Sequence, residues 1–584
     1  MAPFASSQGG SGVEATLAAR RIELAGSPGL AGLLKNGRTT SIAVFASLGG
    51  LVYGFNQGLF GQILSMNSFA RASGVTGIEN ATLSGLLTSI LELGAWVGVL
   101  ANGYLADRLG RKLCTVLACF IFIIGVIIQA CTHGGNYDYI LAGRTVTGLG
   151  VGSLSMVVPL YNAELAAPEI RGSLVSLQQL AITFGIMISY WITYGTNYIG
   201  GTGEGQSSAA WLIPITIQIL PALILAAGMA FVVPESPRWL MNEGRDQEAL
   251  NVIANLRRLP EKDLLVQMEY LELKAQKLFE MRLSQHDFPH LQGDSAGSKF
   301  KLGLAQYKSL FANPSNLRRT LVAILVMFFQ QWTGVNFILY YAPFIFQSIG
   351  LDSSNTISLL ASGVVGVAMF LATIPAVLYV DSWGRKPTLI VGAICMGVCH
   401  LSVAIIIATC SDNWAAHTAA GWVACVFIWL FAVAFGFSWG PCAWVVVAEV
   451  FPLGLRAKGV SLGASSNWLN NFAVAMSTPD FVKAAKYGAY IFLGLMSIIG
   501  AAYVYFFVPE TKQRTLDELD ELFGDNSGRS KWEAEQMLQA QREVGLLRLA
   551  GITEAGDALP INEKEKDDDS SSHGKKDDLD VHTA

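Results

Sequence analysis

Long apolar segments alternate with short polar ones along most of the chain. Each apolar run is long enough for a helix to cross roughly 30 Å of hydrocarbon. A polar stretch separates a first group of six runs from a second group of six, so the pattern predicts an all-α membrane protein with twelve transmembrane helices. The runs centre on residues 41–64, 83–105, 113–131, 138–160, 173–196, 210–233, 319–348, 357–380, 387–410, 420–448, 458–480 and 487–508.

This pattern divides the chain into two helical halves, a linker between them and two tails. The C-terminal tail is charged and poor in apolar residues, so we expect it to be largely disordered. No apolar stretch of signal-peptide type precedes the first run, which is therefore expected to direct insertion itself. The predicted parts are an N-terminal tail at 1–40, a first half at 41–233, a helical linker at 234–318, a second half at 319–508 and the tail at 509–584.

Composition supports a membrane protein and argues against other classes. The 584 residues are 52% hydrophobic and 14% charged, whereas soluble domains carry about 25% charged residues. The net charge is -5 and no basic stripe is present, so nucleic acid is not an expected partner. The eight cysteines lack zinc-ligand spacing, and the sequence contains no nucleophile motif or phosphate loop. We therefore expect no metal, no cofactor and no enzymatic activity.

Short-loop charge predicts the orientation of the helices. Basic residues concentrate on the side that holds the linker, and the positive-inside rule places that side, with both termini, in the cytosol. The triplet Asn80-Ala81-Thr82 then lies in the first outer loop, where Asn80 is a candidate glycosylation site. The cytosolic loops carry Arg108, Arg111, Lys112, Arg171, Arg385, Lys386, Arg456 and Lys458, whereas the outer loops carry Arg71, Lys483 and Lys486.

Short charged motifs of the first half recur in the same order in the second. This repetition predicts two pseudo-symmetric bundles, an arrangement typical of alternating-access transporters. The pairs are Asp107-Arg108-Leu109-Gly110-Arg111-Lys112 with Asp381-Ser382-Trp383-Gly384-Arg385-Lys386, Glu164 and Arg171 with Glu449 and Arg456, and Pro234-Glu235-Ser236 with Pro509-Glu510-Thr511.

These motifs resemble the sugar porter family of the major facilitator superfamily, and most of all its fungal monosaccharide (hexose) transporters. The resemblance covers about 41–524. It implies the major facilitator fold and transport of a small neutral sugar across a lipid bilayer. Further residues that carry it are Gly143-Arg144, Pro237-Arg238, Gln330-Gln331 with Gly334 and Asn336, and Pro509-Glu510-Thr511-Lys512.

Side-chain amides in the seventh run suit a sugar, because they donate and accept hydrogen bonds without a charge to desolvate. Gln330, Gln331 and Asn336 would point in different directions on an ideal helix. They can converge on one ligand only if Gly334 lets the helix bend or a partner approach closely. The alternative is that they join neighbouring helices by hydrogen bonds.

The resemblance implicates a wider set of side chains in sugar binding. Tryptophan can present an aromatic face to the sugar while its indole N–H donates a hydrogen bond. Tyr340 and Tyr341 are implied as an outer gate. The implied binding residues are Gln179, Gln330, Gln331, Asn336 and Trp444, with Asn467, Trp468 and Asn471 as weaker members.

Charged residues at the cytosolic helix ends are implied to hold the two halves together when the site faces outward. The alternative is a simple topology signal. That alternative leaves unexplained why acids recur at fixed offsets from the arginines. The predicted cytosolic clasp consists of Asp107, Arg108, Arg111, Glu164, Arg171, Glu235, Arg238, Asp381, Arg385, Glu449, Arg456 and Glu510.

Three residues bear on energy coupling. Proton-coupled members of the family have Asp where this chain has Asn56, which cannot titrate, while the usual partner Arg144 is present. Glu92 lies within the second run, and an ionisable residue in a span suggests a function. It is a candidate counter-ion of Arg144, a candidate proton carrier, or a glutamate bonded to backbone. Met369 and Gly436 replace polar residues of other members and obscure the identity of the sugar.

Together these features predict a monomeric uniporter for a glucose-like monosaccharide, with no covalent chemistry, in the plasma membrane. Two alternatives stay open. One is a proton–sugar symporter that uses Glu92. The other is a sugar sensor with a transporter fold that signals through the long C-terminal tail.

Overall fold

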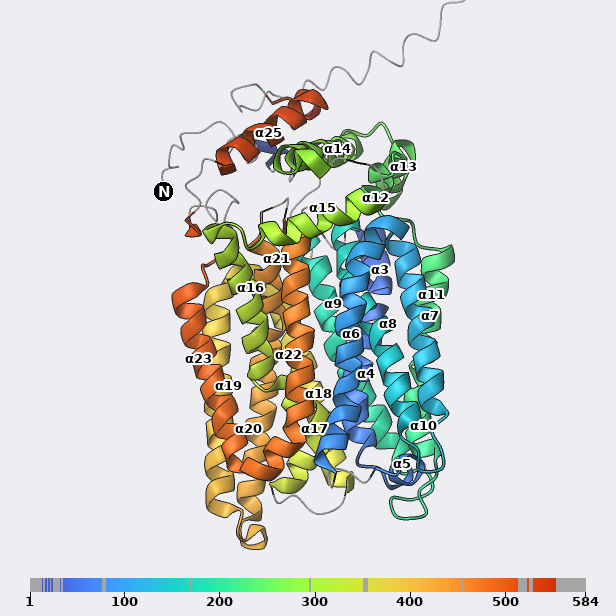
Figure 1. The fold of residues 1–584 in the computed structure, drawn as a ribbon, viewed down its shortest axis with the longest axis vertical. Coiled ribbons are helices and arrows are strands. Elements are labelled where there is room, and N and C mark those ends of the chain that lie inside the picture. The colour runs from blue at the N-terminus through green and yellow to red at the C-terminus, as the bar shows by residue number, and fades with distance from the viewer. Residues whose placement is uncertain are drawn as a thin grey trace, which may run out of the picture.

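The structure, a computed structural model, is built from helices. It describes residues 13, 16, 17, 19–21, 23, 24, 32, 35–75, 80–166, 170–291, 293, 296–349, 355–452, 455–512, 522–524 and 529–552. Long helices run side by side in a bundle, and shorter helices lie across one end (Figure 1). We call that end the linker end and the opposite end the far end.

The first half contains six spans. The first is made of α3 and α4 and the sixth of α10 and α11, each pair being nearly continuous. A short helix, α5 (Asn67–Ser73), follows the first span at the far end. The spans are α3 (Gly37–Ala46) with α4 (Leu48–Ile63), α6 (Ala81–Leu109), α7 (Arg111–Ala130), α8 (Asp138–Leu165), α9 (Arg171–Thr196), and α10 (Ala209–Ile217) with α11 (Ile219–Phe231).

The second half repeats this plan, and two of its spans are broken near their middles. The seventh span, α16 and α17, begins at Pro314, earlier than the expected residue 319, because proline suits the first turn of a helix. The spans are α16 (Pro314–Trp332) with α17 (Val335–Ser348), α18 (Asn355–Trp383), α19 (Arg385–Cys410), α20 (Thr418–Phe437) with α21 (Trp439–Glu449), α22 (Arg456–Ala485) and α23 (Tyr487–Phe507).

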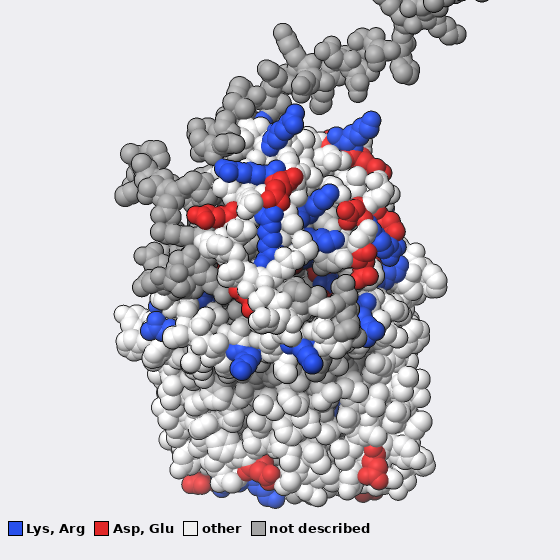
Figure 2. All heavy atoms as spheres, turned by 45° about the horizontal axis from the view of Figure 1, so that its top comes forward, with Lys and Arg blue, Asp and Glu red and all other residues white. Residues whose placement is uncertain are grey.

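The prediction of twelve membrane helices in two halves is confirmed. Within the described residues, ten spans are long and apolar enough to cross a membrane by length and composition. The other two, α9 and α22, contain 26 and 30 residues and pack along α4 and α6 respectively. Each half has its own large apolar core. A broad belt with few charged side chains surrounds the bundle, and charges gather over the linker end (Figure 2).

The linker forms helices that cover the linker end, namely α12 (Pro237–Asn242), α13 (Asp246–Arg257), α14 (Leu264–Asp287) and α15 (Ala296–Ser309). Part of the C-terminal tail packs on them as α25 (Arg529–Glu543) and α26 (Leu546–Leu549). Leu546 and Leu547 are buried against Met268 of α14, together with Val13 and Leu17 of the N-terminal tail. The expectation of a disordered tail is therefore wrong for 529–552, because a few leucines find an apolar surface that the linker supplies.

Candidate functional site

The seventh span bends where its amides lie. Gly334 has a φ of +94°, a left-handed conformation that favours glycine, and it separates α16 from α17. The bend lets Asn336 Nδ2 donate to Gln331 Oε1 at 2.5 Å, although the two residues would diverge on a straight helix. Of the two possibilities that the sequence left open at Gly334, a bend or the close approach of a partner, the structure has the bend, and it brings both amides to the same place.

Gln330 points to the break in the tenth span. Its Nε2 donates to the backbone oxygen of Trp439 at 2.8 Å, and its Oε1 accepts from Asn467 Nδ2 at 2.6 Å. Trp439 is the first residue of α21, directly after the break between α20 and α21. In this conformation Gln330 and Asn467 therefore bond helices together, as the alternative interpretation of the amides expects.

Two buried polar atoms of α22 remain without a partner in the described part of the chain. They are Trp468 Nε1, a donor, and Asn471 Oδ1, an acceptor. Both side chains are fully buried, and the indole of Trp468 packs on the ring of Tyr53 at a centroid distance of 5.2 Å. Because unsatisfied buried polar atoms are costly, a ligand hydroxyl or a water is expected at this position.

Gln179 and Trp444 lie between the two halves, nearer to the linker end. A Cβ atom added to Gly440 would lie 3.3 Å from Gln179 Nε2, so the first half reaches the broken tenth span of the second. Trp444 packs against the apolar cores of both halves. Both side chains are partly exposed, whereas Gln331 and Asn336 are buried. The solvent exposure of these four side chains therefore increases towards the linker end.

The far end of the interface is closed by backbone contact. A Cβ atom on Gly61 of α4 would lie 1.7 Å from the carbonyl oxygen of Tyr340 in α17, and Tyr190 Oη donates to the carbonyl oxygen of Leu339 at 2.5 Å. Tyr341 is equally buried and donates to the carbonyl oxygen of Ala475 at 2.9 Å. Tyr340 and Tyr341 thus lie where the predicted outer gate requires them.

The three coupling candidates do not form one cluster of ions. Asn56 Nδ2 donates to Gln218 Oε1 at 2.9 Å. Arg144 donates to the carbonyl oxygen of Thr88 at 2.7 Å and lies over the ring of Phe60. Among the described residues no ion pair joins Arg144 to Glu92 within 4.0 Å. Direct pairing of these two charges is therefore not part of this conformation.

Glu92 instead reaches across to the second half. Its Oε1 accepts from Tyr340 Oη at 2.7 Å, and its Oε2 accepts from Asn471 Nδ2 at 3.4 Å. Gln57 joins the same group, since its Nε2 donates to Tyr53 Oη and Tyr340 Oη. Sequence reasoning missed both Gln57 and the partners of Glu92. The position of Gln57 beside Asn56 was the only local signal.

The clasp residues form ion pairs within each half. Arg111 pairs with Glu164 at 2.7 Å and with Asp107 at 3.2 Å, and Arg385 pairs with Glu449 at 2.8 Å. Further members lie close by. Glu235 and Glu510 accept backbone N–H groups. Arg238 pairs with Glu280 of the linker. Arg108 is exposed, and Arg456 Nε donates to the backbone oxygen of Phe451. The side chains of Arg171 and Asp381 lie outside the described residues. The clasp between halves stays a prediction.

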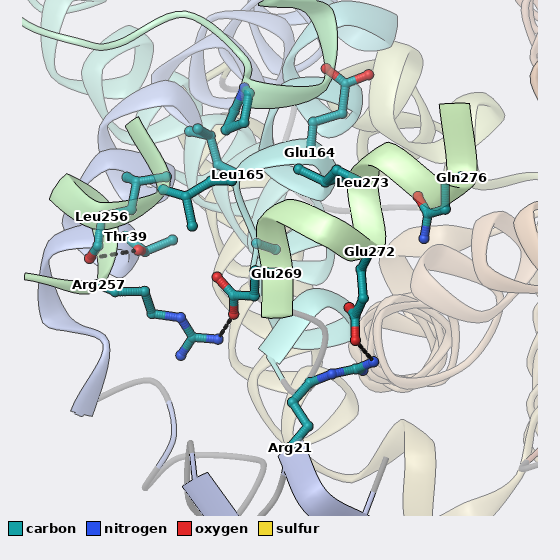
Figure 3. Close-up of a pocket in the computed structure, with 13 residues that line it drawn as sticks. Arg21, Thr39, Glu164, Leu165, Leu256, Arg257, Glu269, Glu272, Leu273 and Gln276 are labelled. Atoms are coloured by element: carbon teal, nitrogen blue, oxygen red, sulfur yellow. Dashed lines mark hydrogen bonds and ion pairs between the residues drawn. The ribbon is translucent and has the colours of Figure 1, made fainter. Parts of the chain in front are cut away.

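A separate cavity of about 140 Å³ lies at the linker end, between the first half and α13 and α14 (Figure 3). Arg257 pairs with Glu269 at its edge, and Arg21 of the N-terminal tail pairs with Glu272. Glu164 also lines the cavity and pairs with Arg111. The cavity is lined by other residues than the amide cluster.

The candidate glycosylation site lies at the far end. Asn80 is exposed there, and its Oδ1 accepts from the backbone N–H of Leu83. Glycosylation of Asn80 stays a prediction.

Comparison with known proteins now decides the family. The family described as "Sugar (and other) transporter" matches residues 42–523. The chain belongs to this family. It is a sugar transporter that spans the membrane several times, and the predicted resemblance is confirmed.

Three members of this family illustrate the similarity. A probable glucose transporter of Neurospora crassa, rco-3, is 33% identical over 86% of this chain and 83% of its own. The high glucose sensor RGT2 of Saccharomyces cerevisiae is 34% identical over 84% and 61%. Among solved structures, the proton:xylose symporter XylE of E. coli, bound to 6-bromo-6-deoxy-D-glucose, has a TM-score of 0.66 at 28% identity, over 83% of this chain and 99% of its own.

Proposed function

We propose that this sugar transporter carries a glucose-like monosaccharide down its gradient across the plasma membrane, as a monomeric uniporter with its linker and termini in the cytosol. The bent seventh span carries the proposal. Gln331 and Asn336 meet there, and Trp468 and Asn471 offer a free donor and a free acceptor nearby. Neutral groups of both kinds suit sugar hydroxyls. The similarity to rco-3, a probable glucose transporter, supports the choice of hexose.

The uniport part rests on Asn56. A symporter needs a group that gains and loses a proton as the site changes sides, and an amide cannot do so. Asn56 is instead bonded to Gln218 in the first half. Transport should then be passive, and the sugar should equilibrate without accumulating.

Uptake in cells that lack other sugar transporters tests this. We expect labelled hexoses to enter, a non-metabolised analogue to equilibrate, and a protonophore to leave the initial rate unchanged. Uphill accumulation that a protonophore abolishes would contradict uniport. Absence of hexose uptake from cells with the protein at their surface would contradict the substrate class.

A proton–sugar symporter is the second candidate. Glu92 is a buried carboxylate between the halves, and the similar protein XylE is a proton:xylose symporter. In that case uptake should rise as external pH falls, and Glu92→Gln should convert uphill transport to simple exchange. If Glu92 has no proton-carrying role, Glu92→Gln should leave the pH dependence of uptake unchanged.

A sensor is the third candidate. The similar protein RGT2 is a high glucose sensor, and the described tail segment of this chain packs on the linker. A sensor should bind hexose with little uptake. Its signal should depend on the tail. Deletion of residues 513–584 should abolish signalling in a sensor and leave the uptake rate of a transporter within about twofold, since the site lies in the bundle.

A further inference from the structure

The carboxylate of Glu92 connects the two halves of the bundle. Glu92 belongs to α6 of the first half, and both side chains that donate to it, Tyr340 and Asn471, belong to the second half. Gln57 of the first half adds a bond to the same Tyr340 hydroxyl at 3.3 Å. The group therefore spans the interface, next to the atoms that the sugar is proposed to contact.

These bonds depend on closure of the far end. Glu92 is 1% exposed. Arg144, the buried cation of the same half, forms no ion pair with it; it donates to the carbonyl oxygen of Thr88 and lies over the ring of Phe60. Rocking that parts α6 from both α17 and α22 at the far end would separate Glu92 from Tyr340 and Asn471. A buried carboxylate that loses its donors must find water or other donors, which costs free energy.

We propose that Glu92 is a positioning residue of transport, a latch that stabilises the conformation closed at the far end by holding Tyr340 and Asn471 of the opposite half. The proposal rests on alternating access, as the proposed function requires. The sugar does not have to touch the carboxylate for the latch to act. Its effect is on the balance between the two conformations.

The second half has no counterpart of this latch. Gly366 of α18 lies at the position that the Asp107 and Asp381 repeat assigns to Glu92. A Cβ atom on Gly366 would lie 2.9 Å from the Cα atom of Met187 in α9, so helix packing takes the place of a polar contact there. The latch thus lies where α6 meets the second half, and the equivalent contact between α18 and α9 lacks it.

A crosslink across the far end can measure closure directly. Thr82 of α6 and Asp480 of α22 are both exposed, and Thr82 Oγ1 donates to Asp480 Oδ2 at 3.2 Å. Thr82→Cys with Asp480→Cys places two thiols at this contact, in a chain that also carries Cys131→Ser to remove an exposed thiol. A short bifunctional thiol reagent applied from outside then captures the closed conformation.

Glu92→Gln should lower the ratio of closed to open molecules about fivefold to tenfold, the size expected for loss of one buried hydrogen bond, and this crosslinking should slow in proportion to the closed fraction. It should also lower turnover and strengthen sugar binding from outside, because a larger fraction of molecules faces outward. Purely structural damage would weaken binding instead. Tyr340→Phe removes a donor from the other half, so its effect should not add to that of Glu92→Gln. Glu204→Gln, an exposed change in a far-end loop, should leave the rate unchanged.

Crosslinking at the parent rate in surface-expressed Glu92→Gln would overturn the latch. If Glu92→Gln does not reach the surface, Tyr340→Phe decides alone, and an unchanged rate in that variant overturns the latch. Failure of the proposed function would look different. Hexose uptake would then be absent from the parent protein, whereas the crosslinking difference between parent and Glu92→Gln would persist.

Discussion

The two halves carry the same charged arrangement at the linker end and different polar groups in the middle of the bundle. At the linker end, Glu235 accepts the backbone N–H of Lys112 at 3.3 Å, and Glu510 accepts that of Lys386 at 3.0 Å. The arginine–glutamate pairs differ by only 0.1 Å between the halves, 2.7 Å against 2.8 Å. The charged clusters at the linker end thus have the same geometry in both halves.

In the middle the symmetry is lost. The second half supplies the buried amides Gln331, Asn336 and Asn471, whereas the first supplies the ionisable Glu92 and Arg144. A sugar has no twofold symmetry, so a site between two equivalent halves cannot contact it symmetrically. Under the proposals above, the amides of the second half contact the sugar, whereas Glu92 of the first half biases the conformation.

The largest effect is expected where backbones of the two halves touch. Gly61→Val should abolish transport, because its Cβ atom would lie 1.7 Å from the carbonyl oxygen of Tyr340 and prevent closure of the far end. Hexose uptake with a surface-expression control measures this. Gly195→Ala, at a helical glycine with open space around it, should transport normally. Normal uptake by Gly61→Val would show that closure there is not required.

The charged clusters should differ in stability despite their similar geometry. Arg111→Ala should cost about 3 kcal/mol, because it leaves Glu164, whose side chain is 4% exposed, without its charged partner. Arg385→Ala should cost about 1 kcal/mol, because Glu449 is 32% exposed and keeps the hydrogen bond from Thr511. Thermal unfolding in detergent measures both. Equal losses would mean that the two clusters are energetically symmetric.

In the amide cluster, Gln331→Ala and Asn336→Ala should each weaken sugar binding by about 1–3 kcal/mol while leaving membrane insertion intact. Because the two amides bond to each other, the losses in the double variant should not add. The KM for hexose uptake measures this. Asn470→Ala, which removes an amide of α22 that accepts from Trp332 Nε1, should change the KM less. Normal KM values in both variants would mean that these amides only join helices.

The smallest effect concerns the tail, outside the symmetric bundle. The hydrogen bond from Arg282 lowers the pKa of Glu543, so this ion pair adds to the docking of α25 above the ordinary pKa of glutamate, about 4.3, and its contribution is lost as pH falls through the lowered pKa. The protection of 529–552 against hydrogen exchange, taken relative to the intrinsic exchange rate at each pH, should therefore decrease at low pH. Glu543→Gln should decrease this protection at pH 7 and remove its pH dependence. Glu535→Gln, exposed on the same helix, should change neither.

The sequence by itself determined the twelve spans and the two halves. Apolar run lengths and charged repeats are local signals, and the bilayer leaves a chain with such runs few other solutions. Gly334 between Gln331 and Asn336 allowed either a bend or the close approach of a partner, and the structure decided for the bend.

Only the tertiary structure decided which polar groups meet across the interface and where the tail docks. Glu92 has no partner that its own helix predicts, since Tyr340 and Asn471 come from helices of the other half. Likewise, the partners of the Gln330 amide, the backbone oxygen of Trp439 and the side chain of Asn467, come from other helices. The tail orders because Leu546 and Leu547 find the surface of α14. Such contacts depend on which faces the packed bundle brings together, and no spacing along a single helix contains that information.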